Sequence, residues 1–251
     1  MAGLGQQTFF PMLHTPDKRH AVRARIAMSR ECLIRTFDLA YEFLRRKINN
    51  GRIRVVNEAS LQLQFASILK SAGELFEVER EDFFSIDLEK AVRLNGESFG
   101  KSSSERTKID VFFSFTNAAT REPVSCAVEI SVFKKKNHRE PNNRYDVCAD
   151  IHSLESYGTF ADCCFLVVAT DHDHYLGQDT YSPDTTDFDF RHGSQYVAGT
   201  SATYRTAEPY GPPIALHDSY SVAWDAAVGG LHFLKLPVDP RREPAPLCER
   251  D

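Results

Sequence analysis

Two apolar runs, 109–115 and 124–133, dominate the hydrophobic pattern of the chain, and a short polar connection containing Asn, Thr and Pro separates them. Both runs are rich in Val, Ile and Phe, which predicts two neighbouring strands. Each run contains an acid where a buried strand should not tolerate one: Asp110 near the start of the first and Glu129 within the second. Because side chains alternate between the two faces of a strand, Glu129 and Ser131 are expected to share a face.

Helical periodicity marks three further segments. A long helix over 15–50 is predicted from the capping signal at Thr15-Pro16 and the stop at Asn50-Gly51, and its outward face is rich in Arg. A second helix is predicted from the cap Asn57 to about Ala72. A third helix is predicted over 145–157, where apolar residues recur on one side.

The run 163–170 is almost continuously apolar, which is typical of a central strand buried on both faces. A final strand is predicted over 231–238, with weaker short strands elsewhere. The weaker strands and the predicted loops are as follows: strands 52–56, 75–79 and 83–86; loops 97–108, 134–144 and 171–189; short strands and turns over 190–222.

This order of elements predicts an α/β fold with a mixed sheet flanked by helices on both sides. The length of 251 residues suits one domain, 1–251. Its core is expected at about 55–170, with the basic N-terminal helix 15–50 before it and a C-terminal elaboration, 171–251, after it.

Charge is unevenly distributed along the chain. The net charge is −5, yet residues 1–70 contain 12 Lys/Arg against 5 Asp/Glu, and residues 146–251 contain 6 against 17. A basic third is compatible with a surface that meets phosphates, although solvated helical Arg residues give the same pattern. The six cysteines lack metal-binding spacing, and no signal peptide or membrane span is recognisable, so we expect reduced thiols in a cytoplasmic protein.

A carboxylate inside an apolar strand is costly unless it is paired, hydrogen-bonded or bound to a cation. One interpretation of Asp110 and Glu129 is an edge-strand Glu in water and an Asp at a strand entrance. The other is a site for a hard divalent cation between adjacent strands, because oxygen ligands of this kind suit Mg²⁺. Residues 171–174 (DHDH) also invite a metal interpretation, but such residues commonly end strands in water.

The arrangement of these elements resembles the PD-(D/E)XK nuclease superfamily, which includes many restriction endonucleases. The resemblance covers roughly residues 55–170 and is carried by Ile109-Asp110-Val111 and Val128-Glu129-Ile130-Ser131, preceded by a helix that bears Glu58 and Gln62. It implies a restriction-endonuclease-like fold and metal-dependent cleavage of nucleic acid.

By this resemblance Asp110 and Glu129 would bind Mg²⁺, and Glu58 would be an auxiliary ligand. In the family a lysine follows the Glu by two residues and lies near the attacking water. This sequence has Ser131 at that position. Lys135, which has the same strand parity as Glu129, could reach back to the site, or the metal alone could lower the pKa of its bound water. A degenerate nuclease fold that binds without cutting is the remaining interpretation.

We therefore expect a restriction-type endonuclease that hydrolyses phosphodiester bonds in DNA with Mg²⁺, or with Mn²⁺ as a substitute. Contacts to the nucleic acid are expected from the basic first helix and from Gln62, Lys134, Lys136, Arg139 and Arg144. Two alternatives from other classes are a nucleic-acid-binding or assembly module on the same fold and a metal-free scaffold whose acidic half binds a basic partner. The sequence leaves a homodimer open.

Overall fold

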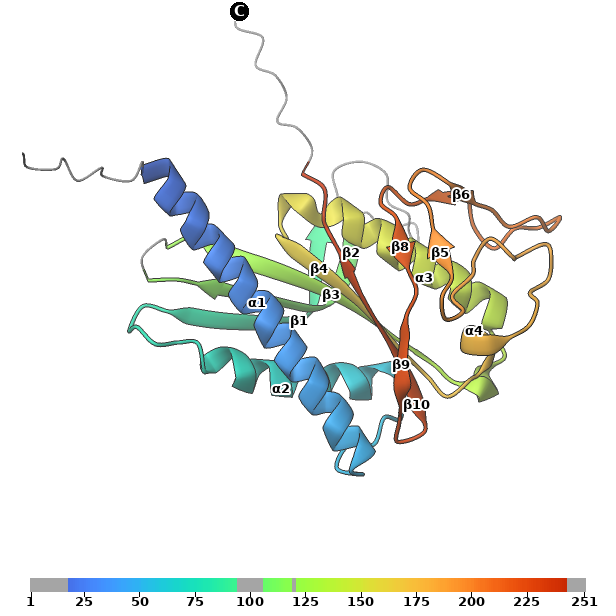
Figure 1. Ribbon diagram of the computed structural model, residues 1–251, viewed down its shortest axis with the longest axis horizontal. Helices are drawn as coiled ribbons and strands as arrows, with labels where there is room; N and C mark the ends of the chain where they lie inside the picture. Colours follow the sequence, from blue (N-terminus) through green and yellow to red (C-terminus); the bar gives the residue numbers. More distant parts are fainter. Residues whose placement is uncertain (1–17, 94–105, 119–120, 243–251) are drawn as a thin grey trace, which may run out of the picture.

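A computed structural model describes residues 18–93, 106–118 and 121–242, and shows a mixed α/β fold with a six-stranded sheet between helices (Figure 1). Helices α1 (Lys18–Asn49) and α2 (Glu58–Glu74) pack on one face of the sheet, and α3 (Glu140–Glu155) packs on the other. No helix in the described ranges combines the length and the apolar composition needed to cross a bilayer.

The sheet has the strand order β1-β2-β3-β4-β10-β9. Its strands are β1 (Phe83–Arg93), β2 (Arg106–Thr116), β3 (Pro123–Phe133), β4 (Cys163–Thr170), β9 (Trp224–Val228) and β10 (Leu231–Val238). Only β3 and β4 pair in parallel, with α3 as the connection between them, and the other neighbours are antiparallel. The first residues of β2 therefore lie at the same end of the strands as the last residues of β3 and β4.

Strand β3 is buried along most of its length because both of its faces are covered. Cys126 and Val128 belong to the core under α1 and α2, whereas Ala127 belongs to the core under α3. Alternation along the strand therefore turns Glu129 and Ser131 toward α3. Both are buried, with Glu129 9% exposed and Ser131 6% exposed.

The C-terminal part of the chain covers the outer side of α3. Its short elements are α4 (His174–Gly177), β5 (Gln195–Tyr196), β6 (Ser201–Ala202), β7 (Ile214–Ala215) and β8 (Tyr220–Ser221), and two 3₁₀ turns, η1 (Lys135–Asn137) and η2 (Ser156–Thr159), flank α3. The segment after β10 passes over η2 so closely that a Cβ atom on Gly158 would lie 1.8 Å from the carbonyl oxygen of Arg241. Glycine at this position is therefore required by the packing.

Several predictions from the sequence are confirmed. Helix α2 begins after the predicted cap, and Asn57 and Ser60 form a reciprocal capping box. The strands expected at 163–170 and 231–238 are β4 and β10, and the two acid-containing runs are β2 and β3. The predicted helix start at Thr15-Pro16 and most of the predicted loop 97–108 lie outside the described residues.

Other predictions are wrong. Residues 52–56 and 75–79 form no strand, and β1 extends well beyond the short strand expected at 83–86. The segment 134–144 is not a loop throughout, because α3 already begins at Glu140, with a proline in its first turn. The first turn of α3 is polar, because Asn143 and Arg144 are buried against the C-terminal region by hydrogen bonds, so the start of the helix has no apolar periodicity by which it could be recognised.

Candidate functional site: a carboxylate cluster at the sheet edge

The start of β2 and the end of β3 bring Asp110 and Glu129 together. The last backbone pair between the two strands is Val111 with Val128, and the antiparallel register continued by one residue sets Asp110 opposite Glu129. At this point the Asp110 side chain replaces the backbone as acceptor, because Oδ2 of Asp110 accepts a 2.7 Å hydrogen bond from the Ile130 amide. The two predicted metal ligands are thus neighbours across adjacent strands.

Asp110 lies in an unusual electrostatic environment. Burial raises the pKa of its carboxyl to about 7, the hydrogen bond from the Ile130 amide opposes this rise, and the negative charges of Glu58, Asp150 and Glu89 add to it. A carboxyl that is surrounded by other acids and titrates near neutrality is typical of a functional site, and a bound cation would relieve the repulsion.

Helix α2 contributes Gln62 and Glu58 to this edge. Gln62 is buried, and its amide nitrogen donates to the backbone carbonyl of Asp110 at 2.5 Å and to Oε1 of Glu89 at 3.1 Å. Glu58 lies one turn earlier on the helix, is exposed, and contributes to the raised pKa of Asp110. Gln62 therefore positions the start of β2 rather than reaching outward to a nucleic acid.

The backbone is irregular on the other side of Asp110 as well. Glu89 of β1, opposite Asp110 in the register, has a φ of 52°, in the left-handed region that glutamate rarely adopts. Such outliers cost on the order of 1–3 kcal/mol and cluster at functional sites. Here the distortion holds a further acid beside Asp110.

Glu129 is buried and its carboxylate has a tyrosine partner. The hydroxyl of Tyr157, which follows α3, donates to Oε1 of Glu129 at 3.2 Å. Burial, and secondly the charge of Glu129, raises the pKa of Tyr157 well above its ordinary value, so the phenol stays protonated and keeps donating. Tyr157 thereby fixes the direction of the Glu129 carboxylate.

Ser131 is the residue that, by the resemblance to PD-(D/E)XK nucleases, would stand where those proteins have a lysine. Its hydroxyl lies 3.5 Å from Oδ2 of Asp150 on α3, at the limit of a hydrogen bond. The half-buried Asp150 adds negative charge where the family has positive charge. The cluster is consequently richer in acid than the sequence motif alone indicates.

The downstream lysines leave the strand before they could line this face. β3 ends at Phe133, and Lys135 lies in the turn η1, with its amide donating to Oδ1 of Asp171 at 2.8 Å and its side chain exposed. Strand parity therefore does not place Lys135 beside Glu129. Lys134 pairs with Asp171 at 3.6 Å, and Lys136 is exposed on the same turn.

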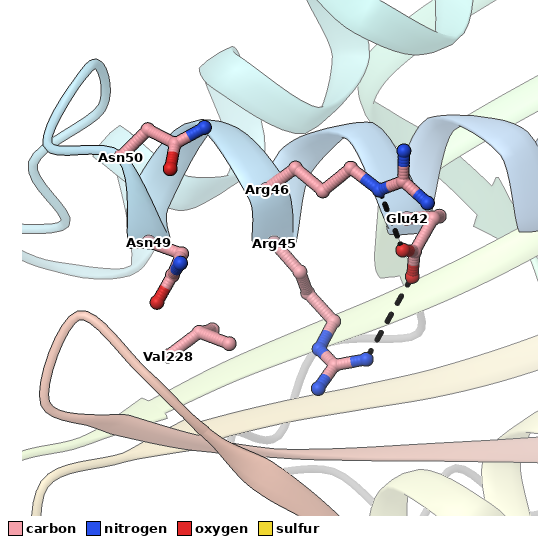
Figure 2. Close-up of a pocket in the computed structure, with 6 residues that line it drawn as sticks. All are labelled: Glu42, Arg45, Arg46, Asn49, Asn50 and Val228. Atoms are coloured by element: carbon pink, nitrogen blue, oxygen red, sulfur yellow. Dashed lines mark hydrogen bonds and ion pairs between the residues drawn. The ribbon is translucent and has the colours of Figure 1, made fainter.

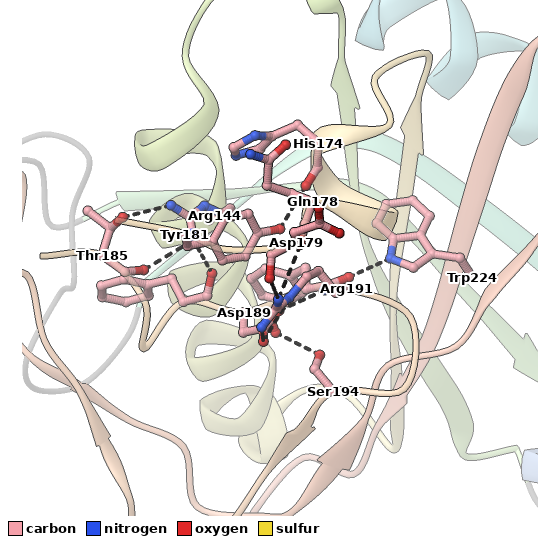
Figure 3. A network of polar contacts seen from close by, with 12 residues as sticks. Arg144, His174, Gln178, Asp179, Tyr181, Thr185, Asp189, Arg191, Ser194 and Trp224 are labelled. Atoms are coloured by element: carbon pink, nitrogen blue, oxygen red, sulfur yellow. Dashed lines mark hydrogen bonds and ion pairs between the residues drawn. The ribbon is translucent and has the colours of Figure 1, made fainter. Parts of the chain in front are cut away.

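The two predicted arginine contacts have different surroundings. Arg139 is exposed and lies 3.7 Å from Asp146, so its guanidinium faces solvent at the start of α3. Arg144 is only 2% exposed, and Figure 3 shows its guanidinium directed into the C-terminal region, where it donates to Thr185 and to the Phe188 carbonyl. Arg144 is thus a packing element of the fold, and its burial leaves no surface for a phosphate contact.

The basic helix α1 is largely neutralised in its described part. Figure 2 shows a pocket near its C-terminal end in which Arg45 and Arg46 both pair with Glu42. The pocket is lined by Glu42, Arg45, Arg46, Asn49, Asn50 and Val228. Arg45 also lies 3.5 Å from Asp225 of β9, so this arginine holds the helix to the sheet, whereas Arg46 pairs within the helix.

The donor set of the cluster suits a hard cation. Carboxylate oxygens from two adjacent strands match the way Mg²⁺ is held, by one or two carboxylates with several waters retained. Asp110, Glu129 and Glu58 do not form a group of three with ligand atoms mutually within 4.8 Å; in the described part of the chain only His152, Glu155 and His217 do so. The three predicted ligands therefore do not all converge on one point.

Three residues of the cluster, Glu89, Asp150 and Tyr157, were missed by sequence reasoning. Asp150 and Tyr157 both lie in the crossover between β3 and β4, and both reach back to the acid-bearing face of β3. Comparison of the chain with known protein families, curated proteins and solved structures gives no match. A function must therefore be argued from the geometry of these side chains.

Proposed function

We propose that the protein is a Mg²⁺-dependent nuclease of restriction-endonuclease-like fold that hydrolyses phosphodiester bonds in DNA. The observation that carries this proposal is the pair of acids on adjacent strands, of which Asp110 has a pKa raised to about 7 by burial and by its acidic neighbours. A carboxylate that is buried among other acids is costly to keep, and binding of a divalent cation is the simplest reason to keep it.

Each residue has a distinct part in this proposal. Asp110 and Glu129 would hold the ion, Tyr157 orients Glu129, and Gln62 fixes the backbone that carries Asp110. When bound, Mg²⁺ would acidify a water and stabilise the charge that develops on the phosphate. Because Asp110 must be ionised to bind the cation, metal affinity and cleavage should rise as the pH increases through 7.

The proposal departs from the family pattern at one point. With Ser131 beside Asp150, β3 has no lysine at the position from which the family assists the attacking water. Activation of the water would then depend on the metal, as it does in enzymes whose bound ion lowers the pKa of water.

Cleavage assays with matched variants test the proposal. Supercoiled plasmid, single-stranded DNA and RNA would be incubated with Mg²⁺, Mn²⁺ or EDTA. Asp110→Asn and Glu129→Gln should abolish metal-dependent cleavage. Asp87→Asn and Glu122→Gln, which remove exposed carboxylates elsewhere on the sheet, should retain it. Cleavage that persists in both site variants would exclude this site.

A second function is favoured by the Ser131–Asp150 contact, because that pair removes the positive charge on which the family relies. On this alternative the protein is a catalytically degenerate module that binds nucleic acid without cutting. Metal-dependent retention of a labelled duplex, lost in Asp110→Asn and unaccompanied by cleavage with any divalent cation, would support the alternative over the nuclease.

A further inference from the structure

A second cluster of metal-ligating side chains lies at the C-terminal end of α3. His152 and Glu155 are three residues apart on its last turn, and His217 lies between β7 and β8. One ligand atom from each of these side chains lies within 4.8 Å of the others. Within the described ranges no other group of three or more His, Cys, Asp or Glu residues meets this condition.

Glu155 is held rigidly in this cluster. The side chain is 1% exposed, and its Oε1 accepts from the amides of His217 and Asp218 and from the hydroxyl of Tyr220, at 2.8–3.0 Å. Oε2 accepts from the same His217 amide at 3.0 Å, its one hydrogen bond to the described residues. Because a carboxylate oxygen has two lone pairs, Oε2 keeps one for a further partner.

His152 is oriented by the loop that carries His217. Nδ1 of His152 lies 3.3 Å from the carbonyl oxygen of Ala215, and a carbonyl can only accept, so Nδ1 carries the proton. Nε2 then has the lone pair required for coordination. The two imidazole rings stack with centroids 5.7 Å apart and planes 24° apart. A carbonyl that accepts from one ring nitrogen while the other binds metal is the usual support for a histidine ligand.

We propose that His152, Glu155 and His217 bind a zinc ion. Two imidazoles and one carboxylate form a donor set suited to Zn²⁺ and poorly suited to Mg²⁺, which prefers oxygen ligands. Three protein ligands leave the fourth tetrahedral position to water, and the exposed His217 gives the ion access from solvent. The site is separate from the Asp110–Glu129 cluster and does not depend on nuclease activity.

The ion would fasten α3 to the segment that carries His217, at a place where a third part of the chain also packs. Besides His217, the C-terminal segment reaches the same turn, because the Arg241 amide donates to the Glu155 carbonyl at 2.7 Å and the Arg241 side chain lies 3.6 Å from Asp218. Zinc that binds the folded chain and not the unfolded one raises the midpoint of thermal unfolding. The site thus acts as a clamp between α3 and the region that covers it.

Zinc binding to the metal-free full-length protein tests the proposal, measured by calorimetry and by thermal unfolding with and without ZnCl₂. The variants are His152→Ala and His217→Ala, singly and together. The control is His138→Asn, which removes an exposed imidazole from a left-handed position that asparagine tolerates. Circular dichroism and thermal unfolding in EDTA establish that each variant is folded.

We expect the wild-type protein and His138→Asn to bind one zinc ion at this site and to unfold at a higher temperature in its presence. Each single histidine variant should bind at least about 10-fold more weakly, and the double variant should lose the zinc-dependent rise in melting temperature. Co²⁺ should give the visible absorption bands of a four- or five-coordinate ion in the wild-type protein and not in the double variant. A wild-type protein that binds no zinc, or a folded double variant that binds it equally well, would overturn the proposal.

Discussion

Asp110 and Glu155 are two carboxylates that both belong to the β3–α3 region, and their surroundings differ in kind. Glu155 is almost completely buried and accepts hydrogen bonds from two backbone amides and a tyrosine. Asp110 accepts a hydrogen bond from the Ile130 amide, and Glu58, Asp150 and Glu89 each raise its pKa. The fold satisfies the charge of Glu155, whereas at Asp110 it concentrates negative charge.

This difference separates a carboxylate that the fold itself supplies with donors from the one on which the proposed nuclease site depends. Glu155 has two backbone amides and a tyrosine hydroxyl as donors, so its carboxylate finds hydrogen-bond partners within the folded chain. Acids around Asp110 penalise the charged form, so the folded protein bears a cost that a cation would remove. Hydrogen bonding therefore distinguishes the two better than burial does.

The largest expected effect is on catalysis at Asp110. Asp110→Asn should reduce Mg²⁺-dependent cleavage by roughly 10²–10³-fold, equivalent to about 3–4 kcal/mol of transition-state stabilisation, because a neutral amide no longer holds the cation. Single-turnover cleavage of a plasmid measures the loss. His152→Ala, outside this cluster, should cleave at the wild-type rate, and an equal loss in both variants would contradict the separation of the two sites.

Removal of charge from Glu155 should instead destabilise the protein. Glu155→Gln should lower the free energy of unfolding by about 2–3 kcal/mol, because one oxygen becomes an NH₂ group that faces the His217 amide. Urea denaturation followed by circular dichroism measures the change. Glu74→Gln, on the surface beside Lys70, should cost less than about 1 kcal/mol. An unchanged denaturation midpoint in Glu155→Gln would contradict a structural role.

Replacing the Asp110 carboxylate by a neutral amide should stabilise the protein at high pH, whereas the same replacement at Glu155 should destabilise it. The folded-state pKa of about 7 exceeds the ordinary value of 3.8, so the protonated carboxyl stabilises the fold at low pH and this contribution is lost as the pH rises through 7. In EDTA, Asp110→Asn should be more stable than the wild-type protein by about 1–2 kcal/mol at pH 8 and nearly equal to it at pH 4, after allowance for solvent screening. Denaturant titrations at the two pH values test this, and a variant less stable at pH 8 would contradict it.

The smallest effect concerns the neighbours of Asp110. Glu58→Gln and Asp150→Asn should each lower the pKa of Asp110 below about 7, with the larger change in Glu58→Gln, and the associated energies should be under about 1 kcal/mol. Carbon-13 NMR titration of the aspartate carboxyl groups measures the pKa directly. Glu81→Gln, an exposed change at the other end of β1, is the control. A pKa of Asp110 that is the same in all three variants would show that these charges do not act on it.

The acid-bearing strands were predictable from the sequence because their signal is local. An aspartate and a glutamate inside runs of Val, Ile and Phe are conspicuous, and the register of β2 with β3 follows from the short connection between them. The Asn57 cap was equally local, and it fixed the start of α2 and so the placement of Glu58 and Gln62.

The rest of the site depends on contacts between distant segments. Asp150 and Tyr157 look like ordinary polar positions of a helix and its end until α3 is laid against β3. Arg144 looked exposed because it follows a basic segment, yet the chain supplies carbonyls from Thr185 and Phe188, some forty residues later, that allow its burial. Lys135 was misplaced because strand parity was extended beyond Phe133, where the strand ends.

Gly158 has a consequence for how the molecule tolerates change. Since a single methyl group there would overlap the carbonyl of Arg241, replacement by any other residue must lift the tail of β10 away from the helix end. The Arg241 amide would lose its acceptor on Glu155, and the backbone around 239–242 would exchange its hydrogens with solvent faster. The glycine at position 158 thus determines whether the segment after β10 stays packed against the end of α3.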